Sequence, residues 1–186
     1  RKGADPDMAR IDRYLRSNPA AAVAKHYQLD GPCQTVVNAC SSGTDAIGIG
    51  AAWLRSGYCD VVLAGGADEL CRVTYNGFAS LMINDTLPVK PFDAHRKGLN
   101  LGEGAGILVL ESAEFMAKRK KDPRGYVLGY GSATDAYHLT APHPEGSGLR
   151  RALSEALQTA AVRPEQMAFI NAHGTGTPDN DKVESL

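Results

Sequence analysis

The sequence predicts an α/β fold in which a sheet is buried between layers of helices. Short apolar segments typical of strands alternate along the chain with longer segments that have helical spacing. Such alternation is typical of sheets that helices cover on their faces. The chain has 186 residues, of which 43% are hydrophobic and 22% charged, as expected for a globular domain with one core.

The N-terminal part of the predicted fold begins with helices. Pro6 and Pro19 are placed as early helix positions, so residues 6–29 predict one or two helices. Residues 34–39 (QTVVNA) are β-branched and follow a Gly-Pro turn, which indicates a buried strand. The small and apolar residues 41–55 predict a helix that packs very closely on its neighbours.

The middle of the chain continues the alternation. Residues 60–64 (DVVLA) predict a second strand, closed by a turn at the pair Gly65-Gly66. A helix is expected over residues 73–82. Residues 105–111 (AGILVLE) predict a third strand, and residues 112–121 an amphipathic helix with a basic end.

The C-terminal part has the same organisation. A fourth strand is expected over residues 126–132, and residues 147–161 form the clearest amphipathic helix of the sequence. Residues 167–171 predict a last strand, which runs into the segment HGTGT at residues 173–177. The final residues, DKVESL, are expected to form the first turn of a helix.

The composition excludes several function classes. The 20 basic and 21 acidic residues nearly cancel, so nothing indicates binding to nucleic acid. No apolar run reaches the ~18–20 residues of a membrane span, and the first residues lack the apolar core of a signal peptide. The cysteines form no CxxC pair, so we expect no metal site, no disulfides and a cytoplasmic location. They are Cys33, Cys40, Cys59 and Cys71.

Cys40 stands at the sharpest local feature of the sequence. The apolar segment 34–39 ends there, and a helix of small residues begins at once. The N-terminus of a helix favours thiolate over thiol, and nucleophiles project from such strand–turn–helix elbows. A buried structural thiol is the commonest alternative for a free cysteine. On local context alone, both interpretations of Cys40 stay open.

His173 follows the last predicted strand and opens the segment HGTGT. The glycines and threonines after it expose backbone and hydroxyl donors, which could polarise a carbonyl and bind a polar, uncharged chain. A histidine that only caps a turn is the alternative. Together, Cys40 and His173, each at the end of a predicted strand, fit the pattern of a nucleophile and its base.

Five longer segments occur in a distinctive order. They are GPCQTVVNACSSGTDAI, DVVLAGGADE, PVKPFDAHRKGLNLGEGAGILVLE, SATDAYHLTAPHPEG and INAHGTGTPDNDKVE. In this order and spacing, residues 29–186 resemble the β-ketoacyl synthases, the condensing enzymes of fatty acid and polyketide synthesis. Five ordered motifs are far more specific than any one of them alone.

The resemblance implies a thiolase-like fold, with two similar halves stacked as α-β-α-β-α layers, usually in a homodimer. It places residues 1–124 in the C-terminal part of the first half and residues 125–186 at the beginning of the second. The family's first strands, its second histidine and lysine, and its glycine-rich oxyanion turn would then lie outside these residues. We therefore expect an incomplete fold, and no condensation by the 186 residues alone.

The resemblance also implies a mechanism. Cys40 would accept an acyl group from a phosphopantetheine thioester on acyl carrier protein, and a malonyl thioester would then lose carbon dioxide and attack the acyl-cysteine. His173 would stabilise the enolate oxygen. Thr140, Thr175 and Thr177 match positions that line the pantetheine channel. The enzyme itself would bind no cofactor, because the substrates carry the phosphopantetheine.

Two other functions stay open. A related enzyme could act on coenzyme A thioesters, although DAYHLT and HGTGTP fit the carrier-protein-dependent group better. The other is a non-catalytic partner subunit of a heterodimeric ketosynthase, although Cys40 argues against the chain-length-factor type, which lacks it. Residues 95–99 (HRKGL) depart from the commoner Arg-Asp-Gly-Phe pattern, so the subfamily is not fixed. Residues 118–121 and Arg124 could contact an acidic carrier or simply be solvated.

Overall fold

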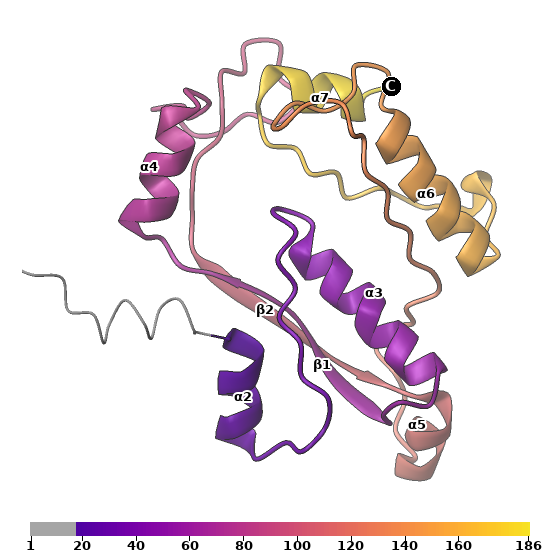
Figure 1. The fold of residues 1–186 in the computed structure, drawn as a ribbon. Coiled ribbons are helices and arrows are strands. Elements are labelled where there is room, and N and C mark those ends of the chain that lie inside the picture. Colours follow the sequence, from indigo (N-terminus) through magenta and orange to yellow (C-terminus); the bar gives the residue numbers. More distant parts are fainter. Residues whose placement is uncertain (1–17) are drawn as a thin grey trace, which may run out of the picture.

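The structure is a computed structural model that describes residues 18–186 (Figure 1). Its elements are α2 (Pro19–Tyr27), α3 (Ser42–Arg55), β1 (Val61–Asp68), α4 (Arg72–Ser80), β2 (Gly104–Glu111), α5 (Ala113–Arg119), α6 (Ser147–Ala160), a 3₁₀ turn (Pro164–Gln166) and α7 (Pro178–Glu184). Within this part of the chain, every helix is too short or too polar to cross a membrane.

The predicted helices are confirmed where the structure describes them. Four of them begin and end within two residues of the predicted bounds, and these are α3, α4, α5 and α6. The helix predicted over residues 6–29 is confirmed as α2 from Pro19 onward, and its earlier part lies outside the described residues. The last helix, α7, begins at Pro178, earlier than the segment DKVESL in which we expected its first turn.

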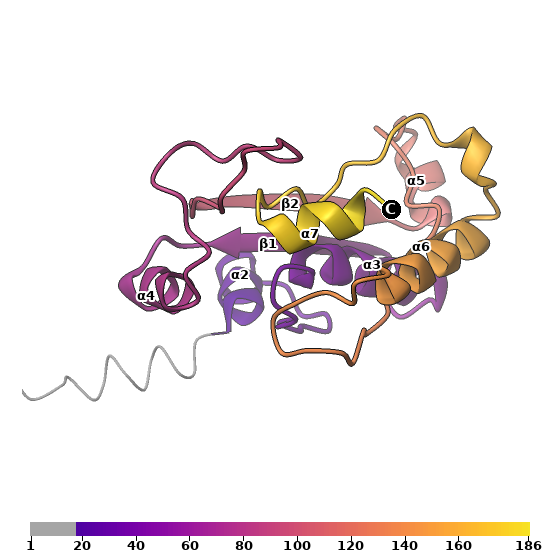
Figure 2. The same ribbon diagram turned by 90° about the horizontal axis from the view of Figure 1, so that it is seen from above.

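The core lies where α3 packs on a two-stranded sheet. β1 and β2 pair antiparallel, and α3 lies along them (Figures 1 and 2). Ala51 of α3 and Ala64 of β1 are both buried. A Cβ on Gly50 of α3 would lie only 3.0 Å from Val62 Cγ1. The small residues of α3 therefore let helix and sheet approach closely, as the sequence predicted.

The pair Gly65-Gly66 belongs to β1 and does not form the predicted turn. Gly65 lies opposite Ile107, and Gly66 lies opposite Gly106. A Cβ on Gly65 would overlap the carbonyl oxygen of Gly106, and a Cβ on Gly66 would lie 3.5 Å from Gly43 Cα in α3. The two glycines therefore allow the backbones of β2 and α3 to approach β1 closely, and the chain does not change direction there.

Three predicted strands are absent from the part of the chain that the structure describes. The segments 34–39, 126–132 and 167–171 follow the apolar pattern of strands but form none. A strand needs a neighbour that completes its backbone hydrogen bonds, and among residues 18–186 only β1 and β2 provide one another with such a neighbour. The sheet is therefore smaller than expected.

The two faces of the sheet differ in their cover. Side chains alternate between the faces of a strand, so Leu63 points away from the face on which Ala64 meets α3. Leu63 and its cross-strand partner Val109 are 39% and 63% exposed, and Ile107 on the same face is 54% exposed. Burial of the sheet between helix layers is therefore confirmed only for the face that α3 covers.

The chain over residues 129–131 lies between α6 and α3 (Figure 1). A Cβ on Gly129 or on Gly131 would overlap the backbone of α6. The side chain of Tyr130, between them, points the other way and rests on Gly48 of α3, where a Cβ would overlap its ring. Three glycines thus allow this segment to connect α6 with α3.

Candidate active site

Cys40 lies in a tight turn directly before α3. Ala39 has a φ of 48°, in the left-handed region that residues other than glycine seldom occupy. The Cys40 side chain is exposed, and the first helical residue, Ser42, follows two positions later. The positive end of a helix favours a thiolate at this place. The expected position of Cys40 at a helix N-terminus is therefore confirmed, although the segment before it is no strand.

Hydrogen bonds hold the residues on both sides of Cys40. The backbone N–H of Asn38 donates to Ser42 Oγ at 2.7 Å. The Asn38 side chain donates to Asp45 Oδ2 at 2.7 Å, and the Ser41 hydroxyl donates to the same oxygen at 2.8 Å. Asp45 is only 6% exposed. Its carboxylate therefore fastens both flanks of Cys40 to the first turn of α3.

The structure brings the side chains of Cys40 and His173 close enough for each to shift the pKa of the other. The interaction with His173 is the largest influence on the pKa of Cys40 and lowers it below that of an ordinary thiol, although partial desolvation and the nearby charge of Asp68 both raise it. The same interaction raises the pKa of His173, although desolvation lowers it. Both shifts favour a thiolate–imidazolium pair.

Glu184 of α7 holds the backbone that carries the imidazole. Its two carboxylate oxygens accept hydrogen bonds from the backbone N–H groups of His173 at 2.7 Å and of Gly174 at 2.8 Å. The Asn180 side chain donates to Glu184 Oε2 at 2.9 Å. The negative charge of Glu184 also contributes to the raised pKa of His173. Glu184 therefore acts on both the position and the protonation of His173.

Asp181 joins three segments around the HGTGT loop. Its side chain is 1% exposed, and its oxygens accept the backbone N–H groups of Gly176 at 3.1 Å and Phe92 at 2.7 Å. Arg96 Nε lies 3.5 Å from Asp181 Oδ2, and Arg96 Nη2 donates to the carbonyl of Pro178 at 2.7 Å. A buried carboxylate with several donors fixes the loop against its neighbours.

The three threonines named from the sequence lie in two places. Thr175 and Thr177 are half-buried in the His173 loop, and their hydroxyl oxygens lie 2.7 Å apart in a hydrogen bond. Thr140 lies in an exposed loop, where its backbone N–H donates to His138 Nδ1 at 3.2 Å. Among the described residues, Thr140 makes no hydrogen bond with His173 or with the other two threonines.

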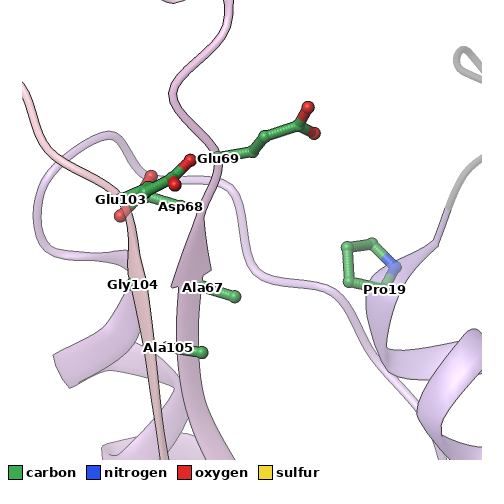
Figure 3. Close-up of a pocket in the computed structure, with 7 residues that line it drawn as sticks. All are labelled: Pro19, Ala67, Asp68, Glu69, Glu103, Gly104 and Ala105. Atoms are coloured by element: carbon green, nitrogen blue, oxygen red, sulfur yellow. The ribbon is translucent and has the colours of Figure 1, made fainter.

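A hollow of about 550 Å³ lies at the end of the sheet, apart from the Cys40–His173 pair (Figure 3). Its carboxylates come from Asp68, Glu69 and Glu103, and Glu103 already accepts the backbone N–H of Leu70 at 3.2 Å. Neither Cys40 nor His173 lines it. We therefore centre the candidate site on the thiol and the imidazole.

Four residues that organise the site are not predicted from the sequence. Asp181 and Glu184 lie three positions apart on α7 and face the same loop, and this spacing directly after HGTGT was a usable signal. Asp45 and Tyr130 are joined by a hydrogen bond of 2.6 Å across 85 positions of the sequence. No local sequence pattern predicts a contact between residues so far apart in the chain.

Two family models match the chain. The N-terminal domain of β-ketoacyl synthases matches residues 3–115, and the C-terminal domain of β-ketoacyl synthases matches residues 124–186. Among curated relatives, the 3-oxoacyl-[acyl-carrier-protein] synthase 2 of Synechocystis is 40% identical over 162 residues, which are 83% of this chain and 39% of that protein.

Solved structures agree with the family models. The structure described as the ishigamide ketosynthase/chain length factor superposes with a TM-score of 0.88 at 41% identity, over 97% of this chain and 44% of that chain. A type II PKS acyl-carrier protein in complex with its ketosynthase gives a TM-score of 0.84 at 33% identity, over 89% of this chain and 43% of that one.

These likenesses and the fold define a thiolase-fold protein, as the sequence predicted. More narrowly, the chain belongs to the β-ketoacyl synthase family. It spans about two fifths of the length of the curated relatives that it matches.

Proposed function

We propose that the protein is a β-ketoacyl synthase that accepts an acyl group on Cys40 and condenses it with a malonyl thioester. The observation that carries this proposal is the position of an exposed Cys40 thiol directly before α3 and beside the imidazole of His173. Thioester exchange needs a thiolate, and the interaction with His173 lowers the pKa of the exposed Cys40 thiol. Family membership gives independent support.

In the acylation step, Cys40 Sγ attacks the carbonyl carbon of an acyl thioester. The bond between that carbon and the donor sulfur breaks, and the leaving thiolate takes up the proton that the cysteine has given up. The malonyl thioester then loses carbon dioxide, and its enolate carbon attacks the acyl-cysteine. The Cys40 thiolate leaves, and a 3-ketoacyl thioester forms. His173 donates to the enolate oxygen as negative charge develops there.

Phosphopantetheine is the proposed carrier of both substrates, so no cofactor resides on the enzyme. The hydroxyl pair of Thr175 and Thr177 beside His173 supports binding of its amide chain, because hydroxyls suit an uncharged polar ligand. Thr140 is proposed for the same channel on its match to the family motif alone.

Acyl carrier protein is the proposed donor, since a similar ketosynthase was solved in complex with one. The basic residues at the end of α5 could bind an acidic carrier, but two of them already form ion pairs within the protein. Lys118 pairs with Glu114 at 2.8 Å, and Arg119 pairs with Glu111 at 2.8 Å. The carrier would therefore contact the remaining basic residues of this segment, which are Lys120, Lys121 and Arg124. A homodimer is proposed on family membership, and a cytoplasmic location on the four free cysteines.

Mass spectrometry of the intact protein incubated with an acyl carrier protein thioester tests the proposal. We expect one acyl adduct, on the peptide that contains Cys40, and its loss in Cys40→Ala. Cys33→Ala is the control, because Cys33 is also exposed but lies away from the helix N-terminus. Absence of an adduct on wild-type Cys40 would overturn the proposal and favour a non-catalytic partner subunit. Transfer from acyl-coenzyme A alone would favour the coenzyme A alternative.

A further inference from the structure

A hydrogen-bonded chain connects Tyr130 to the turn that carries Cys40. The Tyr130 hydroxyl donates to Asp45 Oδ1 at 2.6 Å. The other oxygen of the same carboxylate accepts from Asn38 at 2.7 Å and from Ser41 at 2.8 Å. Asn38 and Ser41 stand two residues before and one residue after Cys40. A single side chain from the C-terminal part of the protein thus reaches both flanks of the cysteine.

Tyr130 is itself held firmly from the side of α6. Its backbone N–H donates to Thr159 Oγ1 at 3.1 Å. The glycines on either side of it leave no room for a side chain against α6, while Gly48 of α3 leaves room only for the Tyr130 ring. The packing of the ring and the backbone hydrogen bond therefore direct the hydroxyl toward Asp45.

The protonation states keep this contact intact near neutral pH. Burial raises the pKa of Asp45, but the hydrogen bonds from Tyr130, Asn38 and Ser41 outweigh it, so that the pKa lies below its ordinary value. Burial first, and then the hydrogen bond to Asp45, raise the pKa of Tyr130. Asp45 thus remains a carboxylate and Tyr130 remains a donor over the range in which the cysteine ionises.

We propose that Tyr130 is a positioning residue, which acts through Asp45 to hold the Cys40 turn where the thiol lies beside His173. The inference rests on the proposed function, in which Cys40 is the nucleophile. Asp45 and Tyr130 touch no reacting atom in this scheme. Their contribution is to keep Asn38 and Ser41 in place around a turn whose Ala39 has an unfavourable φ.

The pH dependence of Cys40 alkylation tests the proposal. The groups that face Cys40 are His173 and Asp68, and those that face Tyr130 are Asp45 and Glu155. In Tyr130→Phe only the hydroxyl is lost, and the ring still fills the space beside Gly48. Iodoacetamide reacts with the thiolate, so its rate follows the ionisation of Cys40.

We expect Tyr130→Phe to slow the alkylation of Cys40 at pH 6.5 by about fivefold, the value of one ordinary hydrogen bond. Above pH 9.5, where the thiol is ionised in any case, the rate should change little. Tyr126→Phe is the matched control, since Tyr126 lies on the same segment and is 72% exposed. Equal profiles for the two variants, with Tyr130→Phe folded, would overturn the proposal.

Asp45→Asn separates positioning from charge, because the two roles predict opposite changes in the alkylation rate of Cys40. If Asp45 acted only as a negative charge near Cys40, its removal would favour the thiolate and speed alkylation at pH 6.5. A positioning role predicts slower alkylation, because the carboxamide presents its NH₂ group to one of the present donors. If Tyr130→Phe does not fold, the exposed Ser41→Ala variant decides, with the same direction of change expected and an unchanged profile overturning the proposal.

Acylation assays on the same proteins separate this inference from the proposed function. If wild-type Cys40 accepts no acyl group but Tyr130→Phe still slows its alkylation, the proposed function fails and the positioning role stands. If wild-type Cys40 is acylated and the alkylation profile of Tyr130→Phe matches that of Tyr126→Phe, the positioning role fails and the proposed function stands.

Discussion

Arg96 and Asp181 form an ion pair in which the guanidinium nitrogen lies 3.5 Å from a carboxylate that is 1% exposed. The pair connects the loop around Phe92 to the helix that follows the HGTGT segment. Because that helix also carries Glu184, the ion pair contributes to the position of His173. The candidate site therefore depends on contacts made well away from Cys40 and His173.

Asp181→Ala should destabilise the protein by about 3 kcal/mol, because its removal leaves buried N–H donors and Arg96 without their acceptor. The midpoint of urea denaturation, followed by circular dichroism, measures this loss. Asp179→Ala is the control, since Asp179 lies in the same turn of α7 and is exposed. Similar midpoints for the two variants would show that the buried carboxylate does not stabilise the fold.

His173→Ala should move the ionisation of Cys40 to higher pH. The interaction with His173 is the largest cause of the lowered pKa of Cys40, so the wild-type thiolate forms at a lower pH than in an ordinary cysteine. Iodoacetamide alkylation between pH 5.5 and 9.5 locates both midpoints. His26→Ala, on the exposed surface of α2, should leave the midpoint unchanged. The prediction fails if both variants behave alike.

Glu184→Gln should lower the pKa of His173. The carboxylate raises that pKa through its charge, and a carboxamide lacks this charge. As pH rises, the imidazolium of the variant should therefore lose its proton earlier than that of the wild type. Titration of the imidazole C–H resonances by NMR measures the shift. Glu165→Gln, exposed in the 3₁₀ turn, is the control, and an equal His173 titration in both variants would contradict the prediction.

Gly48→Ala should destabilise the protein by about 1–3 kcal/mol, because the added methyl overlaps the Tyr130 ring in a packed interior. Gly77→Ala makes the same change in α4, where the new methyl meets open space. That control should be neutral or stabilising by up to about 1 kcal/mol, since alanine favours helices. Thermal denaturation compares the two. Equal effects would show that Tyr130 does not pack on α3 as described.

The positions of Cys40 and His173 could be predicted because each follows an apolar segment directly. The helices were predictable for a similar reason, since their periodicity and flanking residues are local. The Tyr130–Asp45 contact was not, because an acidic residue in the first turn of a helix is already favourable to the helix itself. The residues next to Asp45 in the sequence therefore do not indicate that a distant tyrosine bonds to it.

The errors in the predicted sheet have a common physical cause. Gly65 and Gly66 were interpreted as a turn, but their role follows from Gly106 on the neighbouring strand. The segments 34–39 and 167–171 have the composition of strands, but pairing depends on a partner and not on the segment alone. The local sequence therefore shows that a segment can form a strand, but whether it does depends on a neighbouring strand that pairs with it.

The distance in sequence between Cys40 and its histidine affects the protein during synthesis. A ribosome completes the helix after Cys40 long before it adds His173 and α7. Until that last segment docks, the largest influence that lowers the pKa of the thiol is missing. The nascent chain therefore carries a less reactive Cys40, and the thiol reaches its full reactivity only when folding has brought His173 beside it.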